Sequence, residues 1–219
     1  MTKLFTTIFA VAVSFLTVMA QAQDIKGDAK AGETKNAMCI GCHGIKGYQA
    51  SFPEVYKVPM ISGQSAKYMV LALNAYKKGE RKHPSMRGIA EALSDQDIAD
   101  LAAHYSADGV AAAPATATIK EPSAAVLALL NKANCASCHG ANFSKPIDPS
   151  YPKIAGQHAD YLFVALKAYK TENNPKVGRG NAIMAVMVKQ YTNAELKQLA
   201  GYLSSLDGEL KTIPQAKFR

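Results

Sequence analysis

The 219-residue sequence predicts an all-α protein made of two similar domains in tandem. Several segments place apolar residues at positions i, i+3 and i+4, which is the spacing of an amphipathic helix. No segment shows the apolar and polar alternation that is typical of a strand. The motifs of the first half also recur in the same order in the second half, which indicates an internal duplication.

The N-terminal segment has the pattern of an export signal. Lys3 precedes an apolar run from Leu4 to Met19, and Ala20-Gln21-Ala22 supplies small residues at the spacing of a cleavage site. The run is short for a membrane span, which favours removal after Ala22 over the alternative of an uncleaved anchor. We therefore expect residues 1–22 to be a cleaved signal peptide and the mature chain to be periplasmic.

Composition also places the boundary between the two domains. Residues 108–122 contain Gly109, Pro114 and Pro122 among alternating alanines and threonines, which is typical of a linker. The sequence thus predicts an N-terminal domain over 23–107 and a C-terminal domain over 123–219. Domains of this size form small cores, so a buried cofactor would add needed apolar surface.

All four cysteines belong to two Cys-x-x-Cys-His motifs. The motif residues are Cys39, Cys42 and His43 in the first half, and Cys135, Cys138 and His139 in the second. This spacing is typical of c-type haem attachment, in which two thiols bind the vinyl groups and the next residue brings an imidazole to the iron. On a helical turn the three side chains share one face. The motifs predict two covalent haems, haem 1 at the first motif and haem 2 at the second.

Two other uses of Cys-x-x-Cys pairs fit this sequence less well. Two such pairs can supply the four ligands of a structural zinc ion, but these pairs lie far apart and each is followed directly by His. A thioredoxin-like redox pair needs a strand-helix-strand context, and the sequence shows none. Haem attachment is the interpretation that uses both cysteines and the histidine.

The repeat extends well beyond the haem motifs. The segment from Pro59 to Gln64 (PMISGQ) matches the segment from Pro152 to Gln157 (PKIAGQ), and a helix-period segment follows each. The expected apolar faces are Tyr68, Leu71, Ala72 and Ala75 in the first half, and Tyr161, Val164, Ala165 and Ala168 in the second.

A last helix is predicted to close each half. Its start is signalled by a capping box, Ser94 with Asp97 in the first half and Thr192 with Glu195 in the second. Each box is followed by apolar residues at helix spacing, namely Ile98, Leu101, Ala102 and Tyr105, and then Leu196, Leu199, Ala200 and Leu203.

The repeat also locates a candidate for the second axial ligand of each iron. Met86 lies eight residues before Ser94, and Met184 lies eight before Thr192. This register favours Met184 over its neighbour Met187, which corresponds to Ile89. Met raises the reduction potential of haem iron relative to a second His and closes the iron to small molecules.

Other residues of these types have alternative interpretations. His83 is a rival ligand in the first half, although Asn181 occupies the matching place in the second. Met38, Met60 and Met69 lack a paired register, so we expect them to fill gaps in the core.

The two halves differ in charge. Residues 24–107 contain eleven basic and nine acidic residues, net +2, whereas residues 123–219 contain twelve and six, net +6. An exported chain without a dense basic patch is not expected to bind nucleic acid. The bias instead favours acidic redox partners or peripheral association with membrane headgroups.

The ordered set of motifs resembles the diheme cytochrome c4 family. The resemblance implies two class I cytochrome c domains, each wrapped around a covalently attached haem, related by a pseudo-twofold axis, with the propionate edges facing each other. It also implies that the carbonyls of Pro59 and Pro152 orient His43 and His139 through Nδ1.

Six-coordinate haems of this kind suit one-electron transfer rather than catalysis. We expect a carrier between a quinol-oxidising complex and a terminal oxidase, so that its partners are membrane respiratory complexes or soluble redox proteins. The alternative is the diheme electron-accepting subunit of a redox enzyme, such as a sulfide-oxidising flavocytochrome. A stand-alone haem enzyme would need an open iron site.

Overall fold

The computed structural model describes residues 25–108 and 120–214. The predicted signal peptide and residues 109–119 of the predicted linker lie outside the described residues. Within these ranges the helices are α1 Ala29–Lys35, α2 Ala37–His43, α3 Ala66–Lys77, α4 Pro84–Glu91, α5 Asp95–Asp108, α6 Ala124–Lys132, α7 Ala136–His139, α8 Ala159–Ala168, α9 Ala182–Lys189 and α10 Asn193–Ser204. The strands are β1 Gln49–Ala50, β2 Tyr56–Lys57, β3 Arg81–Lys82 and β4 Gly178–Arg179.

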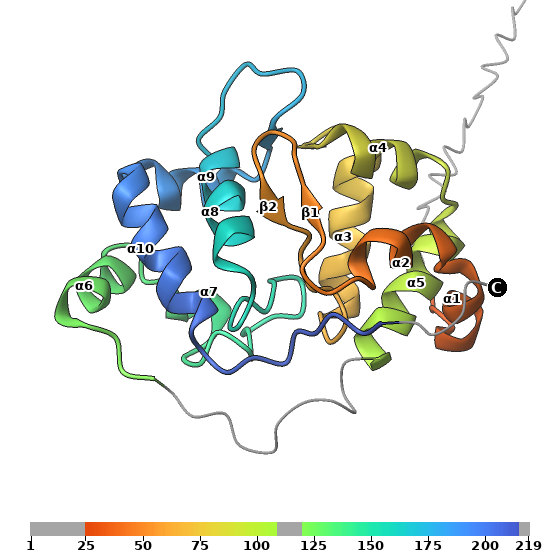
Figure 1. The fold of residues 1–219 in the computed structure, drawn as a ribbon, viewed down its shortest axis with the longest axis horizontal. Helices are drawn as coiled ribbons and strands as arrows, with labels where there is room; N and C mark the ends of the chain where they lie inside the picture. The colour runs from red at the N-terminus through yellow and green to blue at the C-terminus, as the bar shows by residue number, and fades with distance from the viewer. Residues whose placement is uncertain (1–24, 109–119, 215–219) are drawn as a thin grey trace, which may run out of the picture.

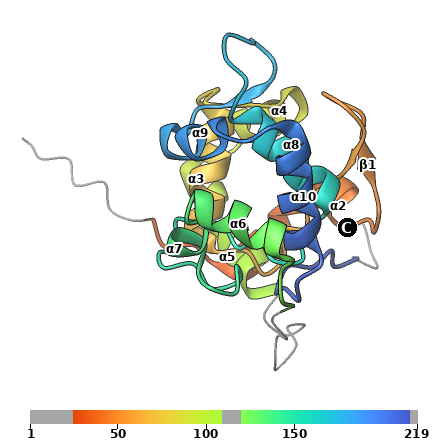
Figure 2. The same cartoon turned by 90° about the vertical axis from the view of Figure 1, so that its left-hand side faces the viewer.

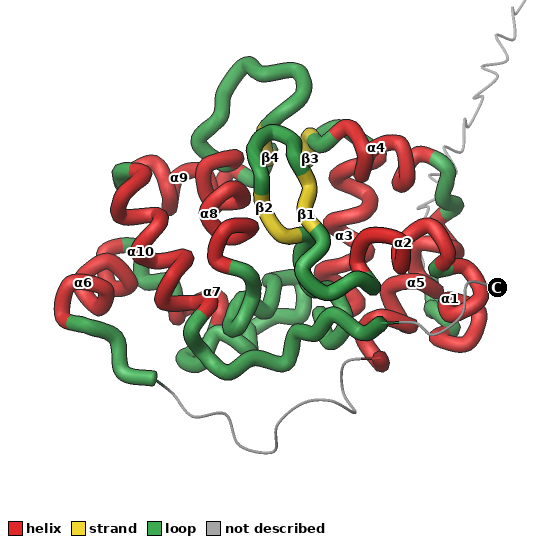
Figure 3. Tube along the Cα trace, viewed as in Figure 1, coloured by secondary structure: helices red, strands yellow, loops and turns green. Residues whose placement is uncertain are grey.

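Among the described residues, each half contributes five helices. Helices α1 to α5 lie on one side of the molecule and α6 to α10 on the other, with the short strands between them (Figures 1 and 3). Figure 2 shows the second half end-on, with α6 and α10 toward the viewer. The prediction of a duplicated, mainly helical protein is therefore confirmed. None of the helices in the described ranges has the length and apolar character needed to cross a membrane.

The strands form two small antiparallel ladders that the sequence did not predict. Strands β1 and β2 pair within the first half, whereas β3 of the first half pairs with β4 of the second, Arg81 opposite Arg179. Two-residue strands carry too few side chains to show alternation, so no pattern marks them. The β3–β4 ladder links the halves directly.

The predicted capping boxes start the last helix of each half. Thr192 Oγ1 accepts the N–H of Glu195, whose carboxylate accepts the N–H of Thr192. Ser94 and Asp97 exchange the same pair of bonds at α5. All eight predicted apolar residues of α5 and α10 are buried, as expected for helices at the centre of each half.

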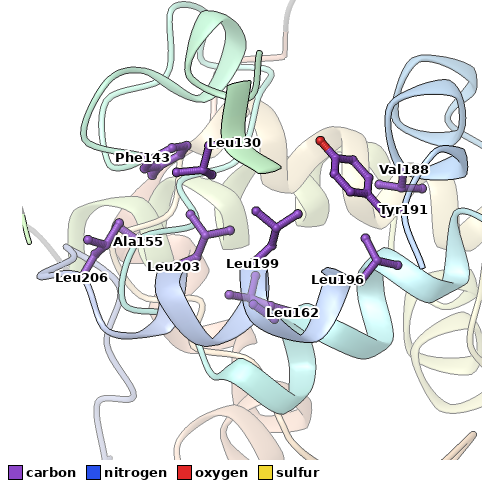
Figure 4. Packing of buried hydrophobic residues seen from close by; sticks show 11 residues of the cluster. Leu130, Phe143, Ala155, Leu162, Val188, Tyr191, Leu196, Leu199, Leu203 and Leu206 are labelled. Carbon is purple, nitrogen blue, oxygen red and sulfur yellow. The ribbon is translucent and has the colours of Figure 1, made fainter. Parts of the chain in front are cut away.

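Helix α10 packs against α6 and α8, as α5 packs against α1 and α3. Figure 4 shows the resulting apolar cluster of the second half, in which leucines of α10 meet Leu130 of α6 and Leu162 of α8. The first half has a smaller apolar cluster, made of Met69, Leu101, Ala102 and Tyr105.

Two expectations about apolar side chains were wrong. Met38, predicted to fill a core gap, is 70% exposed because it lies on the outer side of the short helix α2. Leu71, assigned to the apolar face of α3, is 49% exposed, and Met69 is the buried residue of that helix.

Candidate functional site

Each haem motif lies on a helical turn of its own half. Cys39, Cys42 and His43 occupy the last turn of α2, so they project from neighbouring positions of one helix. In the second half Cys135 is the N-cap of α7, and Cys138 and His139 end that helix. All four cysteines are partly buried, and none of them forms a disulfide. Each half thus presents two thiols and one imidazole from the same turn.

The two motif histidines are held by a proline carbonyl. The Nδ1 of His43 lies 2.8 Å from the carbonyl oxygen of Pro59, and the Nδ1 of His139 lies 3.0 Å from that of Pro152. Because a carbonyl can only accept, Nδ1 carries the proton and Nε2 keeps its lone pair for a metal.

Burial further suits these histidines to bind iron. It lowers the pKa of His139, although the hydrogen bond to Pro152 opposes the shift. The pKa of His43 is lowered mainly by burial, and the positive charge of Arg81 adds to the effect. Both imidazoles are therefore neutral near pH 7, which is the form that binds a metal.

The two candidate methionines occupy equivalent places. Met86 is the third residue of α4, and Met184 is the third residue of α9. The residue before each helix caps it through a side chain: His83 Nδ1 accepts the N–H of Met86 at 3.3 Å, and Asn181 Oδ1 accepts the N–H of Met184 at 2.9 Å. Met187 lies one turn further along α9.

His83 has a structural role that competes with iron binding. Its Nδ1 accepts the N–H of Met86, so its Nε2 carries the ring proton and donates to the hydroxyl of Tyr56 at 2.9 Å. Both ring nitrogens are therefore engaged by protein. His83 caps α4 as Asn181 caps α9. This shared role explains why a histidine and an asparagine stand at equivalent positions of the repeat.

Sequence reasoning did not single out an arginine and tyrosine cluster between the halves. The guanidinium of Arg81 donates to Tyr68 Oη at 3.3 Å and to Tyr161 Oη at 2.9 Å, and Arg179 donates to Tyr161 Oη at 3.1 Å. Burial opposes ionisation of Tyr161, but the charges of Arg179 and Arg81 lower its pKa to about 8. The repeat held the signal, since Arg81 and Arg179 lie five residues before Met86 and Met184.

The donor set fits haem and does not fit zinc. Among the described residues no three His, Cys, Asp or Glu side chains are grouped as metal ligands. The Nε of Arg81 is buried without a hydrogen-bond partner, and neither arginine of the cluster has a carboxylate partner in the described ranges. Buried guanidinium groups that bind tyrosine hydroxyls rather than carboxylates suit the anionic propionates of haem.

Fold and donor set together define a protein with two c-type haem sites. The Cytochrome c family model matches residues 29–105 and 123–207, so the chain belongs to the cytochrome c family. Both matches include one Cys-x-x-Cys-His motif, and the chain carries two c-type haems, at Cys39/Cys42 and Cys135/Cys138.

Within this family the chain is similar to diheme proteins along nearly its whole length. It is 28% identical over 193 residues to cytochrome c4 of Azotobacter vinelandii, covering 82% of this chain and 90% of that protein. The crystal structure of reduced cytochrome c4 from Pseudomonas stutzeri matches with a TM-score of 0.60 and 26% identity, covering 82% of this chain and 99% of that one.

A third relative has a different name. The thiosulfate dehydrogenase electron acceptor of Stutzerimonas stutzeri is 31% identical over 211 residues, covering 90% of this chain and 92% of that protein. All three relatives are electron-transfer proteins. The chain is accordingly a diheme cytochrome of the cytochrome c4 kind and an electron carrier rather than an enzyme.

Proposed function

We propose that the protein is a periplasmic carrier that takes single electrons from a quinol-oxidising complex and delivers them to a terminal oxidase. The observation that supports this most is the matched pair of capped methionine helices, α4 and α9, one for each haem motif. A second protein ligand at each iron leaves no place for a substrate, so the site favours transfer of electrons over catalysis.

In this proposal the bound haems supply the one-electron chemistry and the protein tunes it. His43 with Met86, and His139 with Met184, are the proposed axial pairs, and the carbonyls of Pro59 and Pro152 fix the two imidazoles. The proposed domains are 23–107 and 123–219, joined by a linker over 108–122 and preceded by a cleaved signal peptide over 1–22.

Binding of carbon monoxide to the reduced protein tests the two closed sites. We expect the wild type to bind little of the gas, and Met86→Ala and Met184→Ala each to bind it at one haem, because alanine removes the thioether. The conservative swap Met187→Leu serves as the control and should behave as the wild type. Rapid stoichiometric binding by the wild type would contradict two permanent methionine ligands.

The proposed route is tested with membranes. The reduced protein should be reoxidised by membranes that contain a terminal oxidase, and the oxidised protein should be reduced by those that contain a quinol-oxidising complex. A protein inert toward both kinds of membrane would contradict this route and leave its haem ligation intact.

A second candidate function is that of electron acceptor for a sulfur-oxidising enzyme, such as a thiosulfate dehydrogenase or a sulfide-oxidising flavocytochrome. The similarity to the thiosulfate dehydrogenase electron acceptor of S. stutzeri supports it. The discriminating measurement is the rate of reduction by such an enzyme with its substrate, compared with the rate of reduction by quinol-oxidising membranes.

The charge difference between the halves suggests that the second half docks the oxidising partner. Lys189 and Lys197 are exposed lysines of that half. Replacing both with Gln should slow reoxidation at low salt, because long-range attraction accelerates the encounter and is screened by salt. The same change at Lys30 and Lys78, exposed lysines of the first half, is the matched control. Equal effects from the two double variants would overturn this assignment.

A further inference from the structure

The glutamine that ends each Pro-x-x-x-Gly-Gln segment crosses the boundary between the halves. Gln64 and Gln157 are only 5% and 4% exposed, and the haem proposal gives neither a role. Both side chains bind backbone of the opposite half. Buried amides are costly to leave unpaired, so these contacts define where the halves meet.

The contacts are reciprocal. The Nε2 of Gln157 donates to the carbonyl of Met60 at 2.9 Å, and its Oε1 accepts the N–H of Met60 at 3.1 Å. In the same way, Gln64 Nε2 donates to the carbonyl of Lys153 at 3.0 Å, and its Oε1 accepts the N–H of Lys153 at 2.9 Å. Met60 and Lys153 are equivalent residues of the repeat.

Each glutamine is also oriented by its own half. The Oε1 of Gln157 accepts the N–H of His158 at 3.0 Å, and that of Gln64 accepts the N–H of Ser65 at 2.9 Å. Each Oε1 therefore faces two N–H donors, while Nε2 faces a carbonyl. This arrangement fixes which end of the carboxamide is the acceptor.

Each glutamine binds a peptide N–H, and the carbonyl of that same peptide unit binds a haem-motif histidine. The N–H of Met60 and the carbonyl of Pro59 belong to one planar peptide, and that carbonyl lies 2.8 Å from His43 Nδ1. Lys153 and Pro152 share the equivalent peptide, which faces His139. Fixing the direction of the N–H fixes the direction of the carbonyl, and the bond to the N–H polarises the carbonyl into a stronger acceptor.

We propose that Gln157 of the second half positions His43 of the first, and that Gln64 of the first half positions His139 of the second. Each glutamine is thus a positioning residue for the haem of the other half. This inference rests on the proposed binding of iron by the two histidines. A stronger acceptor at Nδ1 makes the imidazole a more basic ligand, which favours ferric iron and lowers the reduction potential.

The test is a redox titration of haem-loaded Gln157→Met and Gln64→Met. Methionine is similar in length, has no donor for the carbonyl and offers the N–H only a weak thioether acceptor. Gln157→Met should raise the potential of haem 1 and leave haem 2 unchanged, and Gln64→Met should do the opposite. The two potentials are assigned with Met86→His and Met184→His, each of which should lower the potential of one haem.

The control is a contact between the halves that touches neither peptide unit. Lys82 Nζ donates to the carbonyl of Asn174 in the second half at 2.7 Å, in a solvent-exposed contact that involves neither glutamine. Lys82→Gln should leave both potentials close to their wild-type values.

A change in the reduction potential of the haem opposite the mutated half supports the proposal. A change confined to the haem of the mutated half, or equal at both haems, overturns it. Unchanged potentials would also overturn the positioning role of the glutamines, without contradicting the proposed axial ligands. Absence of a His/Met spectrum in the wild type would instead count against the proposed function.

A measurement on the wild type covers the case in which the methionine variants do not fold. The amide protons of Met60 and Lys153 should exchange slowly with solvent, since each is bonded to a buried carboxamide across the boundary. Exchange at the rate of exposed loop amides would overturn the proposal.

Discussion

The two halves present the same haem motif from cores of different chemistry. In the first half α1 crosses α5 at Gly32, where an added Cβ would lie 2.1 Å from the carbonyl oxygen of Asp100. The buried Asp100 side chain then accepts bonds from several donors, namely the N–H of Asp28, Lys35 Nζ and Gln96 Nε2. In the second half α6 meets α10 through leucines, and Leu130 joins an apolar cluster of eleven buried residues.

This difference shows which parts of the fold the haem motif constrains. Both halves keep the cysteine pair, the proline carbonyl and the capped methionine helix, because these positions carry the proposed ligands of the two haems. The helix that precedes the motif only has to pack on the last helix of its half. A close polar crossing and an apolar one both achieve this.

The largest effect should come from truncating the apolar crossing. Leu130→Ala should lower the free energy of unfolding by about 3 kcal/mol, because it removes buried methyl groups and leaves a cavity. The residue at the same distance from the first haem motif is Thr34, which is exposed. Thr34→Ala should change stability by less than about 0.5 kcal/mol. Urea denaturation of the haem-loaded protein measures both, and similar losses would contradict the difference between the cores.

A somewhat smaller effect is expected at the close crossing. Gly32→Ala should lower the free energy of unfolding by about 2 kcal/mol, since the new methyl group must displace the backbone of α5. Gly201 of α10 is a control in the second half, because an added Cβ there meets nothing within 4 Å. Gly201→Ala should stabilise the protein by up to about 1 kcal/mol. Thermal denaturation followed by circular dichroism should show shifts of opposite sign.

The polar network should make the first half sensitive to acid. The bond from Lys35, followed by those from the Asp28 N–H and Gln96, lowers the pKa of Asp100. A carboxylate with a depressed pKa adds stability above its unfolded pKa of about 4, and this is lost as pH falls through the folded value. Asp100→Asn should therefore be less stable than the wild type at pH 7, and the difference should shrink below about pH 4.

The matched control for Asp100 is Gln198, the equivalent residue of α10, which is exposed. Gln198→Ala should leave stability nearly unchanged at every pH. The measurement is the urea midpoint of each protein across the acid range. A constant difference between Asp100→Asn and the wild type at all pH values would show that the carboxylate charge is not what stabilises this crossing.

Local patterns in the sequence predicted most of the fold, the two haem sites and the candidate axial ligands. The haem motifs, the capping boxes at Ser94 and Thr192 and the register of the two methionines each involve residues a few positions apart. Contacts between distant residues were not predictable in this way. Nothing near Tyr56 indicates that its hydroxyl meets His83, and nothing near Gln64 indicates that it binds Lys153.

The same limit explains the prediction that failed in α2. Met38 lies two residues after the buried Asn36 and directly before Cys39. Its helix has seven residues and packs on one side only. Composition alone favoured burial, whereas the tertiary packing decided which side of the helix is covered.

The smallest effect is expected when the cap of the first methionine helix is made like that of the second. His83→Asn should keep α4 capped, because Asn181 caps α9 with the same bond and Asn is among the best N-cap residues. Loss of the Tyr56 bond should cost about 1 kcal/mol. The visible and near-infrared spectrum of the oxidised variant should retain the signature of methionine bound to both irons. If His83 rather than Met86 were the axial ligand, this substitution would change the spectrum of haem 1, and Met86→Ala would leave it unaltered.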